Sequence, residues 1–418
     1  MANGLSKIGK VGKGFDTFQL NSVLLLNDAG DWGSEPDANA VGVIRSTNFN
    51  NNGKLDLSNT AYRTLSPTKR EEKRLYAADI LVERSGGSDT QPVGRVGYIT
   101  EEIEKSQYAF ANFIQRIRID DTTDPKYVYY CLQQLYEMGI TASMQFQTTG
   151  IRNLDWKYYL KIILPNPPKA EQTAIANILS KVDEAIAAVQ TSIDAAERLK
   201  KSLMQNLLTG KMKPDGTFRT PEEFYTDPKF GKVPLGWEVK KIKDVADNLD
   251  NYRKPIKSID RGNLKGVYPY YGAAGIVDYI NDYLFDGIYV LFGEDGENLL
   301  SRKLPQAFIV KGKFWVNNHA HILQIHEDYD IELITYILEA KRYDNIVYGS
   351  AQPKINKSDL NKIKLIIPKG KDEQKKLSER IANIEKIVLQ KQKTKSTLED
   401  LKKSLMQNLL TGKIRIKC

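Results

Sequence analysis

Cysteine and histidine are scarce in this chain of 418 residues, which has two cysteines, Cys131 and Cys418, and three histidines. Two thiols so far apart, one of them at the last residue, cannot build a disulfide framework or a thiolate metal site. Long apolar runs are also missing, and the first residues, MANGLSKIGKVGKG, lack the hydrophobic core of a signal peptide. The sequence therefore predicts a cytoplasmic protein with no membrane segment.

The motifs of nucleotide and metal chemistry are missing as well. No GxxxxGK[ST] loop for phosphate binding occurs. Glu294-Asp295, with Glu297 nearby, is a single acidic turn without further placed carboxylates, which is weak support for Mg²⁺. His319 and His321 have a spacing that can bind zinc from a strand, but the third histidine is His326 and no cysteine is near. We predict no metal and no cofactor.

One segment resembles a methyltransferase motif. Asn166-Pro167-Pro168 matches the start of the Asn-Pro-Pro-aromatic motif of amino-methyltransferases, in which the aromatic ring stacks on the target base. Lys169 stands where the aromatic residue belongs, and no glycine-rich loop follows a strand to hold a cofactor. Because proline is tolerated at the start of a helix, the segment is better explained as the beginning of a helix. No catalytic residue is predicted.

Basic residues outnumber acidic ones. The 61 Lys and Arg residues and 52 Asp and Glu residues give a net charge of +9. This moderate excess favours a polyanionic partner without establishing one.

The strongest feature of the sequence is an internal repeat. Residues 199–211 and 401–413 both read LKKSLMQNLLTGK. Upstream the similarity is weaker but persists: LKIILP ends at Pro165, IKLIIP ends at Pro368, and each is followed by a Glu-Gln pair. A match of thirteen identical positions does not arise by chance, so the chain is a tandem duplication.

Each copy ends in a long predicted helix, because apolar residues recur with the four-and-three spacing of a heptad seam. The seam of the first copy is Ile175, Leu179, Val182, Ile186, Val189, Ile193, Ala196, Leu203 and Leu207. The seam of the second copy is Leu377, Ile381, Ile384, Val388, Lys391, Lys395, Leu398, Leu405 and Leu409. At 1.5 Å per residue each helix would span about 60 Å, which favours two helices packed on each other over two helices buried separately. The seam lysines are expected to lay their stems along the seam and to extend their charges into water.

We therefore predict an α+β fold with a pseudo-twofold tandem repeat, in which two mixed α/β domains are separated by two long antiparallel coiled-coil helices. The predicted parts are a first domain (1–168), a first long helix (169–212), a linker and second domain (213–370), and a second long helix with a C-terminal tail (371–418). Strands are predicted at 41–46, 79–84, 286–292 and 313–325, short helices at 126–136 and 331–340, and a connector at 212–232. Such an arrangement suits a ligand with twofold-related sites at a fixed spacing, such as duplex DNA.

Glycine-rich polar loops are the candidate DNA-binding sites, because glycine lets the backbone approach a ligand and Arg, Asn and Gln suit base edges. In the first domain the candidates are Arg84, Ser85, Gly86, Gly87, Ser88, Gln91 and Arg95. In the second domain they are Tyr271, Gly272, Gly275, Glu294, Asp295, Asn298, Asn317, Asn318, His319, Gln352 and Lys354. Residues 317, 319 and 321 are predicted to share one face of a strand. An ordinary turn or a satisfied polar pair explains each loop equally well.

Taken together, these segments resemble the specificity (S) subunits of type I restriction–modification systems over essentially the whole chain. The resemblance rests on the duplicated LKKSLMQNLLTG helix ends, the Glu-Gln pairs that begin the helices and the VPLGWEV segment that opens the second domain. It also rests on ERSGGSDTQPVGRVG in the first domain and on YPYYGAAGIVDYI, GEDGENLLSR and FWVNNHAHIL in the second. The first domain departs from the pattern because it lacks a Pro-x-Gly-Trp start.

The resemblance implies two target-recognition domains, each reading one half of a split, asymmetric sequence of double-stranded DNA, and paired helices that set the gap. It implies a non-catalytic subunit that two methyltransferase (modification) subunits join and to which restriction subunits can be added. S-adenosylmethionine and ATP would then belong to those partners. Two other interpretations stay open at this stage: a stand-alone DNA-binding regulator, and a self-contained methyltransferase with an unusual cofactor site.

Overall fold

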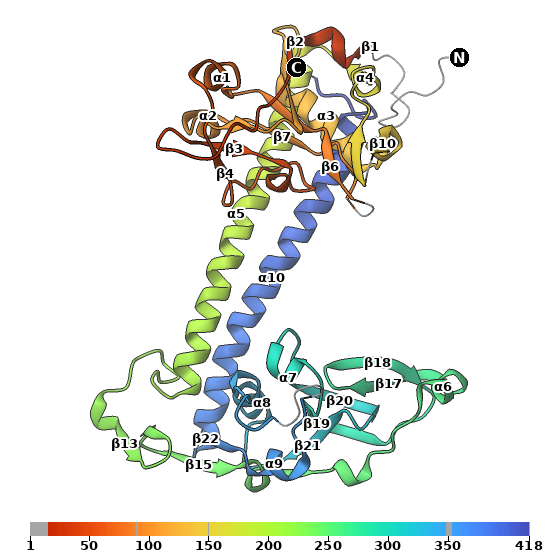
Figure 1. The fold of residues 1–418 in the computed structure, drawn as a ribbon. Coiled ribbons are helices and arrows are strands. Elements are labelled where there is room, and N and C mark those ends of the chain that lie inside the picture. Colours follow the sequence, from red (N-terminus) through yellow and green to blue (C-terminus); the bar gives the residue numbers. More distant parts are fainter. Residues whose placement is uncertain (1–15, 89–90, 149, 348–352, 418) are drawn as a thin grey trace. The chain divides into compact units, whose positions relative to one another are not determined.

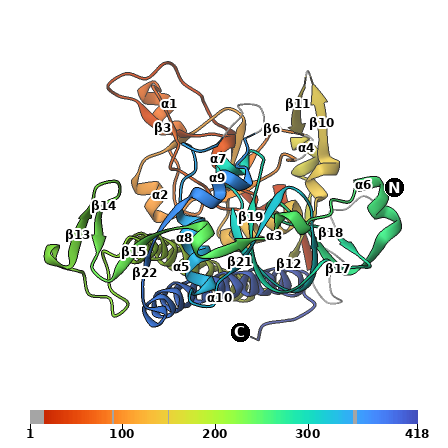
Figure 2. The same cartoon turned by 90° about the horizontal axis from the view of Figure 1, so that it is seen from below.

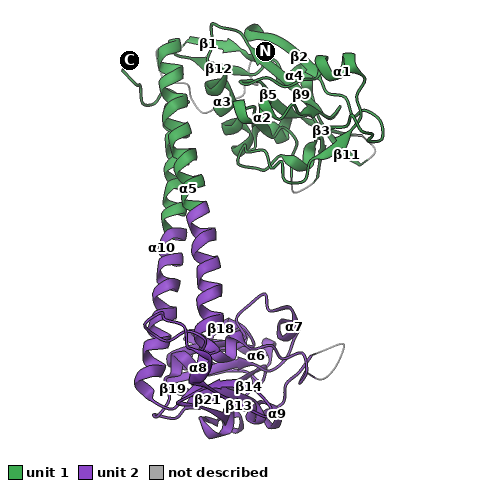
Figure 3. Cartoon of the chain, turned by 90° about the vertical axis from the view of Figure 1, so that its left-hand side faces the viewer, with its two compact units in different colours: residues 1–190, 393–418 green, residues 191–392 purple. Residues whose placement is uncertain are grey.

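A computed structural model describes residues 16–88, 91–148, 150–347 and 353–417, and the chain divides into two compact units. Unit 1 comprises residues 1–190 and 393–418, and unit 2 comprises residues 191–392 (Figure 3). The units therefore do not follow the linear order of the chain. Each combines one mixed α/β domain with the start of one long helix and the end of the other.

The two predicted long helices are present as α5 (Lys169–Leu208) and α10 (Lys371–Leu409) (Figure 1). In unit 1, Lys402 Nζ lies 2.8 Å from Asp183 Oδ1, and Arg415, just beyond α10, pairs with Glu171 at the start of α5. Residue numbers on α5 thus rise as those on α10 fall, so the two helices pair antiparallel within this unit. No helix of the described residues is both long enough and apolar enough to cross a membrane.

In unit 2 the helices also pair antiparallel. Lys200 Nζ lies 2.7 Å from Glu385 Oε1, and Lys391 Nζ donates to Ser192 Oγ at 2.6 Å. Every predicted seam position in both units is buried or half-buried, which confirms the heptad assignment. The head of Lys391 forms a hydrogen bond inside the helix pair, whereas we expected it to extend into water.

Unit 1 contains the first domain. Its strands are β1 (Asp16–Gln19), β2 (Leu24–Ala29), β3 (Val41–Ile44), β4 (Ala61–Arg63), β5 (Ile80–Glu83), β6 (Ser85–Gly87), β7 (Val96–Tyr98), β8 (Ala109–Phe110), β9 (Ile114–Ile119), β10 (Gln145–Thr148), β11 (Ile151–Leu154) and β12 (Ile163–Asn166). Its short helices are α1 (Pro67–Glu72), α2 (Glu101–Lys105), α3 (Pro125–Glu137) and α4 (Trp156–Tyr159). The predicted strands at 41–46 and 79–84 and the helix at 126–136 are confirmed as β3, β5 and α3.

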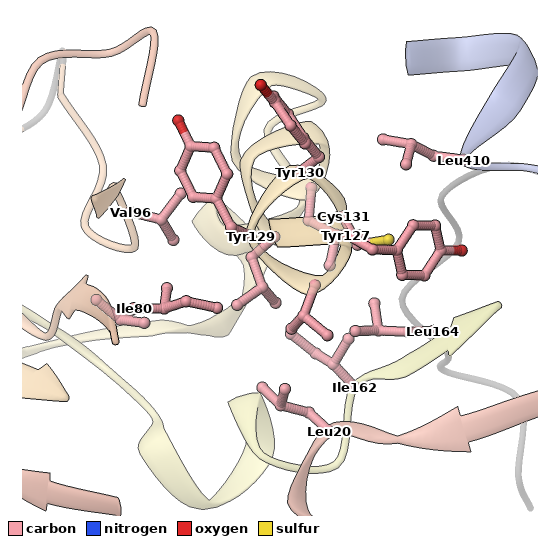
Figure 4. Close-up of a cluster of buried hydrophobic side chains, with 14 of the residues drawn as sticks. Leu20, Ile80, Val96, Tyr127, Tyr129, Tyr130, Cys131, Ile162, Leu164 and Leu410 are labelled. Atoms are coloured by element: carbon pink, nitrogen blue, oxygen red, sulfur yellow. The ribbon is translucent and has the colours of Figure 1, made fainter. Parts of the chain in front are cut away.

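The central sheet of unit 1 has the strand order β2-β9-β5-β7, and a smaller sheet has the order β10-β11-β6. Side chains from α3, β12 and the end of the chain gather in one buried cluster that includes Tyr127, Leu164 and Leu410 (Figure 4). Cys131 belongs to this cluster, and burial raises the pKa of its thiol to about 12, so this cysteine serves packing. The cluster also takes in Ile175 and Leu179, so the domain is anchored on the first turns of α5.

Unit 2 contains the second domain. Its strands are β13 (Phe224–Asp227), β14 (Gly231–Pro234), β15 (Trp237–Lys241), β16 (Ala246–Asn248), β17 (Lys265–Gly272), β18 (Gly275–Ile280), β19 (Phe285–Gly293), β20 (Ala307–Val316), β21 (Ala320–Ile325) and β22 (Lys364–Pro368). Its short helices are α6 (Ser258–Arg261), α7 (Asn298–Ser301), α8 (Ile331–Ala340) and α9 (Lys357–Lys362). The predicted helix at 331–340 is confirmed as α8, and the strand at 286–292 lies within β19.

The sheet of unit 2 has six strands in the order β16-β21-β19-β20-β17-β18. Phe314 of β20 pairs with Phe285 at the start of β19, yet Ala320, only six residues later, pairs with Gly293 at its end. The sheet must therefore curl. Gly287 and Gly312 face each other in this register with φ of 145° and 81°, a backbone bend that other residues rarely adopt.

Two predictions for this domain were wrong. The stretch 313–325 was predicted as one strand, but the structure has two strands, β20 and β21, on opposite sides of β19. The stretch 212–232 was predicted as a plain connector, but β13 and β14 form a hairpin that begins within it, with Tyr225 opposite Val233. In the first domain, β1 pairs with β12 as β15 pairs with β22, so an edge strand is present there without the Pro-x-Gly-Trp start.

Candidate nucleic-acid interface

In the first domain the candidate loop leaves the central sheet at the end of β5. Arg84 is exposed, and its guanidinium has one long contact, 3.5 Å from Nη1 to Gln115 Oε1. Ser85 begins β6 and is buried, with its Oγ donating to Asn153 Oδ1 of β11 at 2.6 Å. The β10–β11 hairpin, whose two strands are labelled in Figure 2, therefore lies beside the loop. A two-stranded ribbon of this kind fits the major groove of DNA.

The glycines and the following turn of this loop are constrained by their surroundings. A Cβ on Gly87 would come 2.8 Å from Gln91 O and 2.9 Å from Val93 Cγ1, so a side chain does not fit. Ser88 N donates to Gln91 O at 2.8 Å, which closes the turn. The Gln91 amide donates to Asn51 Oδ1 at 3.1 Å. These residues shape the loop, and the surface that they present includes the half-buried Gln91 side chain.

Arg95 has a different place from its neighbours in the sequence. It is buried and forms a paired interaction with Glu83, with Nε and Nη2 at 2.8 and 2.6 Å from the two carboxylate oxygens. It also donates to the carbonyls of Phe49 and Ser46. Burial raises the pKa of the Glu83 carboxyl above its ordinary value, and the Arg95 guanidinium opposes that shift. Arg95 therefore fixes the backbone behind the loop, and we leave it out of the proposed DNA surface.

A cavity of about 410 Å³ opens next to Gly86. It is lined among others by Trp32, Arg45, Ser46, Ala111, Asn112 and Phe113. The sequence places Arg45 in the predicted strand at 41–46 and not among the candidate DNA-binding residues. Its neighbours in the sequence do not distinguish it from other arginines near the ends of strands. Only the fold brings residues 32, 45 and 113 together around Gly86.

In the second domain the candidate loop with Gly272 and Gly275 is the turn between β17 and β18. Gly272 pairs with Gly275, whose φ of 148° closes the turn. The Tyr271 ring packs against Phe308 and Phe314, with ring centroids 6.0 and 5.7 Å apart. Tyr271 thus contributes mainly to the core, and the turn residues 272–275 are themselves buried or half-buried.

The predicted shared face of Asn317, His319 and His321 does not form. Asn317 Oδ1 accepts the backbone N–H of His319 at 2.8 Å, an Asx turn that ends β20. Asn317 is buried and its N–H donates to Tyr271 O at 3.0 Å, whereas Asn318 is exposed at the turn. The alternation of a strand cannot continue through a turn, so only His321 lies on β21.

Four of the second domain's candidate residues meet in a charged cluster where β19 ends and β21 begins: Glu294, Asp295, His319 and Lys354. Glu294 is buried, with Arg253 Nη1 2.5 Å from one carboxylate oxygen and Lys354 Nζ 2.9 Å from the other. Burial opposes ionisation of Glu294, but these two cations outweigh it, so the pKa of the carboxyl lies below its ordinary value. Asp295 Oδ2 lies 2.8 Å from Nδ1 of the half-exposed His319. The exposed groups of the cluster are His319 and Lys354.

His321 is fully buried behind this surface. Its Nε2 lies 2.8 Å from the carbonyl oxygen of Ile355, which can only accept, so Nε2 carries a proton. Its Nδ1 lies 2.5 Å from Asp250 Oδ2, so both ring nitrogens of His321 have a partner within the buried cluster. Burial opposes ionisation of Asp250, but His321, the nearby Arg253 and the backbone N–H of Ile322 together outweigh it, so the pKa of Asp250 lies below its ordinary value.

Ligand atoms of Asp250, Glu294 and His321 lie within 4.8 Å of one another, an arrangement that can hold a metal ion. The residues around them do not favour a metal. The short contact between Asp250 and His321 leaves no room for an ion between the two atoms, since metal–ligand bonds are about 2.0–2.2 Å each. Glu294 already has Arg253 and Lys354 on its two oxygens.

Two candidates remain. Asn298 turns its side chain inward: its Nδ2 donates to Leu304 O at 2.9 Å and its Oδ1 accepts Leu304 N–H at 2.8 Å, which fixes the loop after α7. Gln352 lies outside the described residues.

Comparison with known proteins identifies the sequence family. Residues 13–198 and 234–400 match the family described as "Type I restriction modification DNA specificity domain". The chain is 28% identical over 321 residues to the type I restriction enzyme MjaVIII specificity subunit of Methanocaldococcus jannaschii, covering 70% of this chain and 71% of that protein. It is 25% identical over 374 residues to the putative MjaX specificity subunit of the same organism, covering 87% and 85%.

Solved structures share the fold. The crystal structure of the type I restriction–modification system S subunit from M. genitalium has a TM-score of 0.58 at 15% identity, covering 96% of this chain and 98% of that one. A chain from "Structural basis underlying complex assembly and conformational transition of the type I R-M system" has a TM-score of 0.55 at 14% identity, covering 97% and 100%.

Proposed function

Because the chain belongs to the type I restriction–modification DNA specificity family, we propose that it reads a bipartite, asymmetric DNA target, one half with each recognition domain. The observation that carries this proposal is that both halves of the chain match the same family, while the two domains present different side chains around the end of the equivalent strand. The first presents Arg84 and the β10–β11 hairpin, and the second presents Asn318, His319 and Lys354. Two different surfaces on one repeated framework suit two different half-sites.

The chain is proposed to supply recognition and no chemistry. Two adenine-methyltransferase subunits would join it and act on the DNA that it selects, and restriction subunits can be added to that complex. A structural relative comes from a study of complex assembly in a type I system, which supports a role within an assembly. S-adenosylmethionine would bind to the methyltransferase.

The test is genome-wide mapping of methylated adenines in a methylation-free host. The chain is co-expressed with the methyltransferase encoded beside it, and the control strain expresses the methyltransferase alone. The expected result is a split motif, two short half-sites around a fixed gap, that appears only when the chain is present.

Other outcomes separate the alternatives. Unchanged methylation from well-expressed proteins that associate with each other would contradict the proposal. Specific DNA binding by the chain without any association with a methyltransferase would favour a stand-alone regulator. Binding of S-adenosylmethionine by the isolated chain would favour a self-contained methyltransferase.

A further inference from the structure

We infer that Arg45 reads a guanine in the half-site of the first domain. The cavity beside Gly86 would receive the major-groove edge of that base pair. The inference rests on the proposed function, since it names what one part of the DNA surface recognises. Arg45 was not among the residues that the sequence indicated. Four observations on unit 1 support it.

First, the guanidinium of Arg45 is uncommitted. Within the described residues its side chain makes no hydrogen bond or ion pair, and its Nε is a buried donor without a partner. Buried donors are usually paired, so an unpaired one calls for a ligand or water that satisfies it. Other arginines of unit 1 are engaged: Arg116 with Asp28, and Arg118 with Asp79.

Second, the backbone that carries Arg45 is held rigid while its side chain is not engaged. The Arg45 N–H donates to Oδ1 of Asn48 at 2.9 Å, and the buried Asn48 amide donates to Asp56 O at 2.7 Å. Arg95 holds the next turn through the carbonyls of Ser46 and Phe49. A fixed backbone with an available head group is what precise recognition requires, because little freedom is lost on binding.

Third, the candidate loop borders the cavity, because Gly86 is one of its lining residues. Gly86 has a φ of 113°, and a Cβ there would lie 3.2 Å from Ser46 Oγ. Ser46 Oγ also donates to Ser85 O at 3.0 Å, which ties the two rims together. Phe113 O accepts the N–H of Arg84 at 2.9 Å, so a backbone hydrogen bond joins the candidate loop to the cavity wall.

Fourth, the lining favours a base over a phosphate. Among the described residues that line the cavity, Arg45 is the one that is charged, and Trp32, Ala111 and Phe113 form apolar walls. Phosphate sites usually gather several cations or backbone N–H groups, whereas an arginine that forms paired bonds to O6 and N7 is the commonest contact to guanine. The exposed Asn112 at the rim can bond a neighbouring base or the backbone.

The test compares Arg45→Ala with Arg70→Ala in the complex with the methyltransferase. Arg70 is an exposed arginine of α1 whose contact is a 3.3 Å hydrogen bond to Gln107, so both variants remove one charge from the same domain. Methylated adenines are mapped for each. R45A is expected to relax one guanine position of one half-site, with about a tenfold or greater loss of preference there, while R70A leaves the motif unchanged.

A second experiment leaves the protein unaltered, so it gives an answer even if R45A does not fold. Wild-type complex is bound to target DNA in which single guanines are replaced by 7-deazaguanine, which lacks N7, or by inosine, which keeps O6 and N7. One 7-deazaguanine position is expected to weaken binding about tenfold, while inosine at that position does not.

Arg45→Lys keeps the charge but not the paired bonds and should behave like R45A.

Several outcomes would overturn the inference. A motif that survives R45A, or an equal and uniform loss with R45A and R70A, would assign Arg45 to the framework or to a phosphate. Insensitivity to 7-deazaguanine at every guanine of the motif would also overturn it. A wild-type complex that methylates no split motif is a different result, because it removes the proposed function itself.

Discussion

The two recognition domains use the same contacts to hold their helices and different contacts to hold their candidate DNA-binding loops. Gln172 accepts the N–H of Asp124 at 2.9 Å, and Gln374 accepts that of Asp330 at 2.8 Å. Each glutamine also donates to a proline carbonyl just before its helix, at 2.9 Å in both cases. In each pair the aspartate is the N-cap of the domain's helix, α3 or α8. The Glu-Gln pair that both copies of the repeat share therefore fixes how a domain meets the start of its long helix.

Further contacts repeat in the same way. Tyr130 OH donates to Asp183 of α5 at 2.8 Å, and Tyr336 OH donates to Glu385 of α10 at 2.6 Å. The glutamates of the two Glu-Gln pairs each bond an arginine that follows the end of the other long helix: Glu171 with Arg415, and Glu373 with Arg219.

The contacts behind the two loops differ. The first domain uses a single buried pair, Glu83 with Arg95, to fix the turn at residues 46–49. The second uses a larger cluster in which His321 joins Asp250, and Arg253 joins Glu294. The contacts that dock each domain on its long helix are therefore the same in the two domains. The contacts that hold the candidate DNA-binding loop differ, as the loops themselves do.

Domain-resolved stability measurements can test this comparison, because the four tryptophans divide evenly between the units. Trp32 and Trp156 lie in unit 1, and Trp237 and Trp315 lie in unit 2. A variant that keeps only the two tryptophans of one unit reports the unfolding of that unit by fluorescence.

The largest effect is expected from Arg95→Ala. It leaves the carboxylate of Glu83, fully buried, without its partner, and breaking a buried pair typically costs about 3–5 kcal/mol. Arg253→Ala should cost less, because Glu294 keeps Lys354 as a second partner. Urea unfolding of the two single-unit reporters measures both losses. Equal losses would show that the larger cluster gives no redundancy.

A smaller and equal effect is expected from Gln172→Ala and Gln374→Ala. Each removes the partner of the N-cap N–H of a short helix, α3 or α8, and of the proline carbonyl before a long helix, which typically costs about 1–3 kcal/mol. The two unfolding free energies should fall by the same amount within the error of the measurement. A large difference between them would contradict the equivalence of the two docking contacts.

The smallest expected effect is on the pH dependence of stability. The two domains should differ in how much stability they lose in acid, and this difference is small near neutral pH. Asp250 and Glu294 have pKa values below their ordinary 3.8 and 4.5, so the stability that they contribute is present above those values and is lost as the pH falls through the folded values. Glu83 has a raised pKa, so its contribution has the opposite sign and is lost as the pH rises. The urea midpoint of the unit 2 reporter should therefore fall more than that of unit 1 below about pH 4.5.

A matched control sharpens the acid experiment. Glu294→Gln removes one of the two carboxyls with a lowered pKa, so it should reduce the difference between the reporters. A first domain that weakens in acid before the second would contradict the assignment of these charges.

Sequence alone determined the repeat, the two long helices and their seams. Heptad spacing is a local property: once a segment is helical, every third or fourth residue faces the same side whatever packs there. All the predicted seam positions are buried or half-buried for that reason, even where lysines replace Val189 and Ile193. The short helices α3 and α8 were predicted on the same local grounds.

Tertiary structure decided which polar residues face outward. Arg84 and Arg95 look alike in the sequence, yet Arg84 is exposed and Arg95 is buried against Glu83. The turn at Asn317 ended a strand that the apolar pattern predicted to continue, because its side chain captured a nearby backbone N–H. The cavity of Arg45 is assembled from residues that are distant in the chain. Helical periodicity follows from bonds between near neighbours, whereas the partner of a side chain is set by segments that only folding brings together.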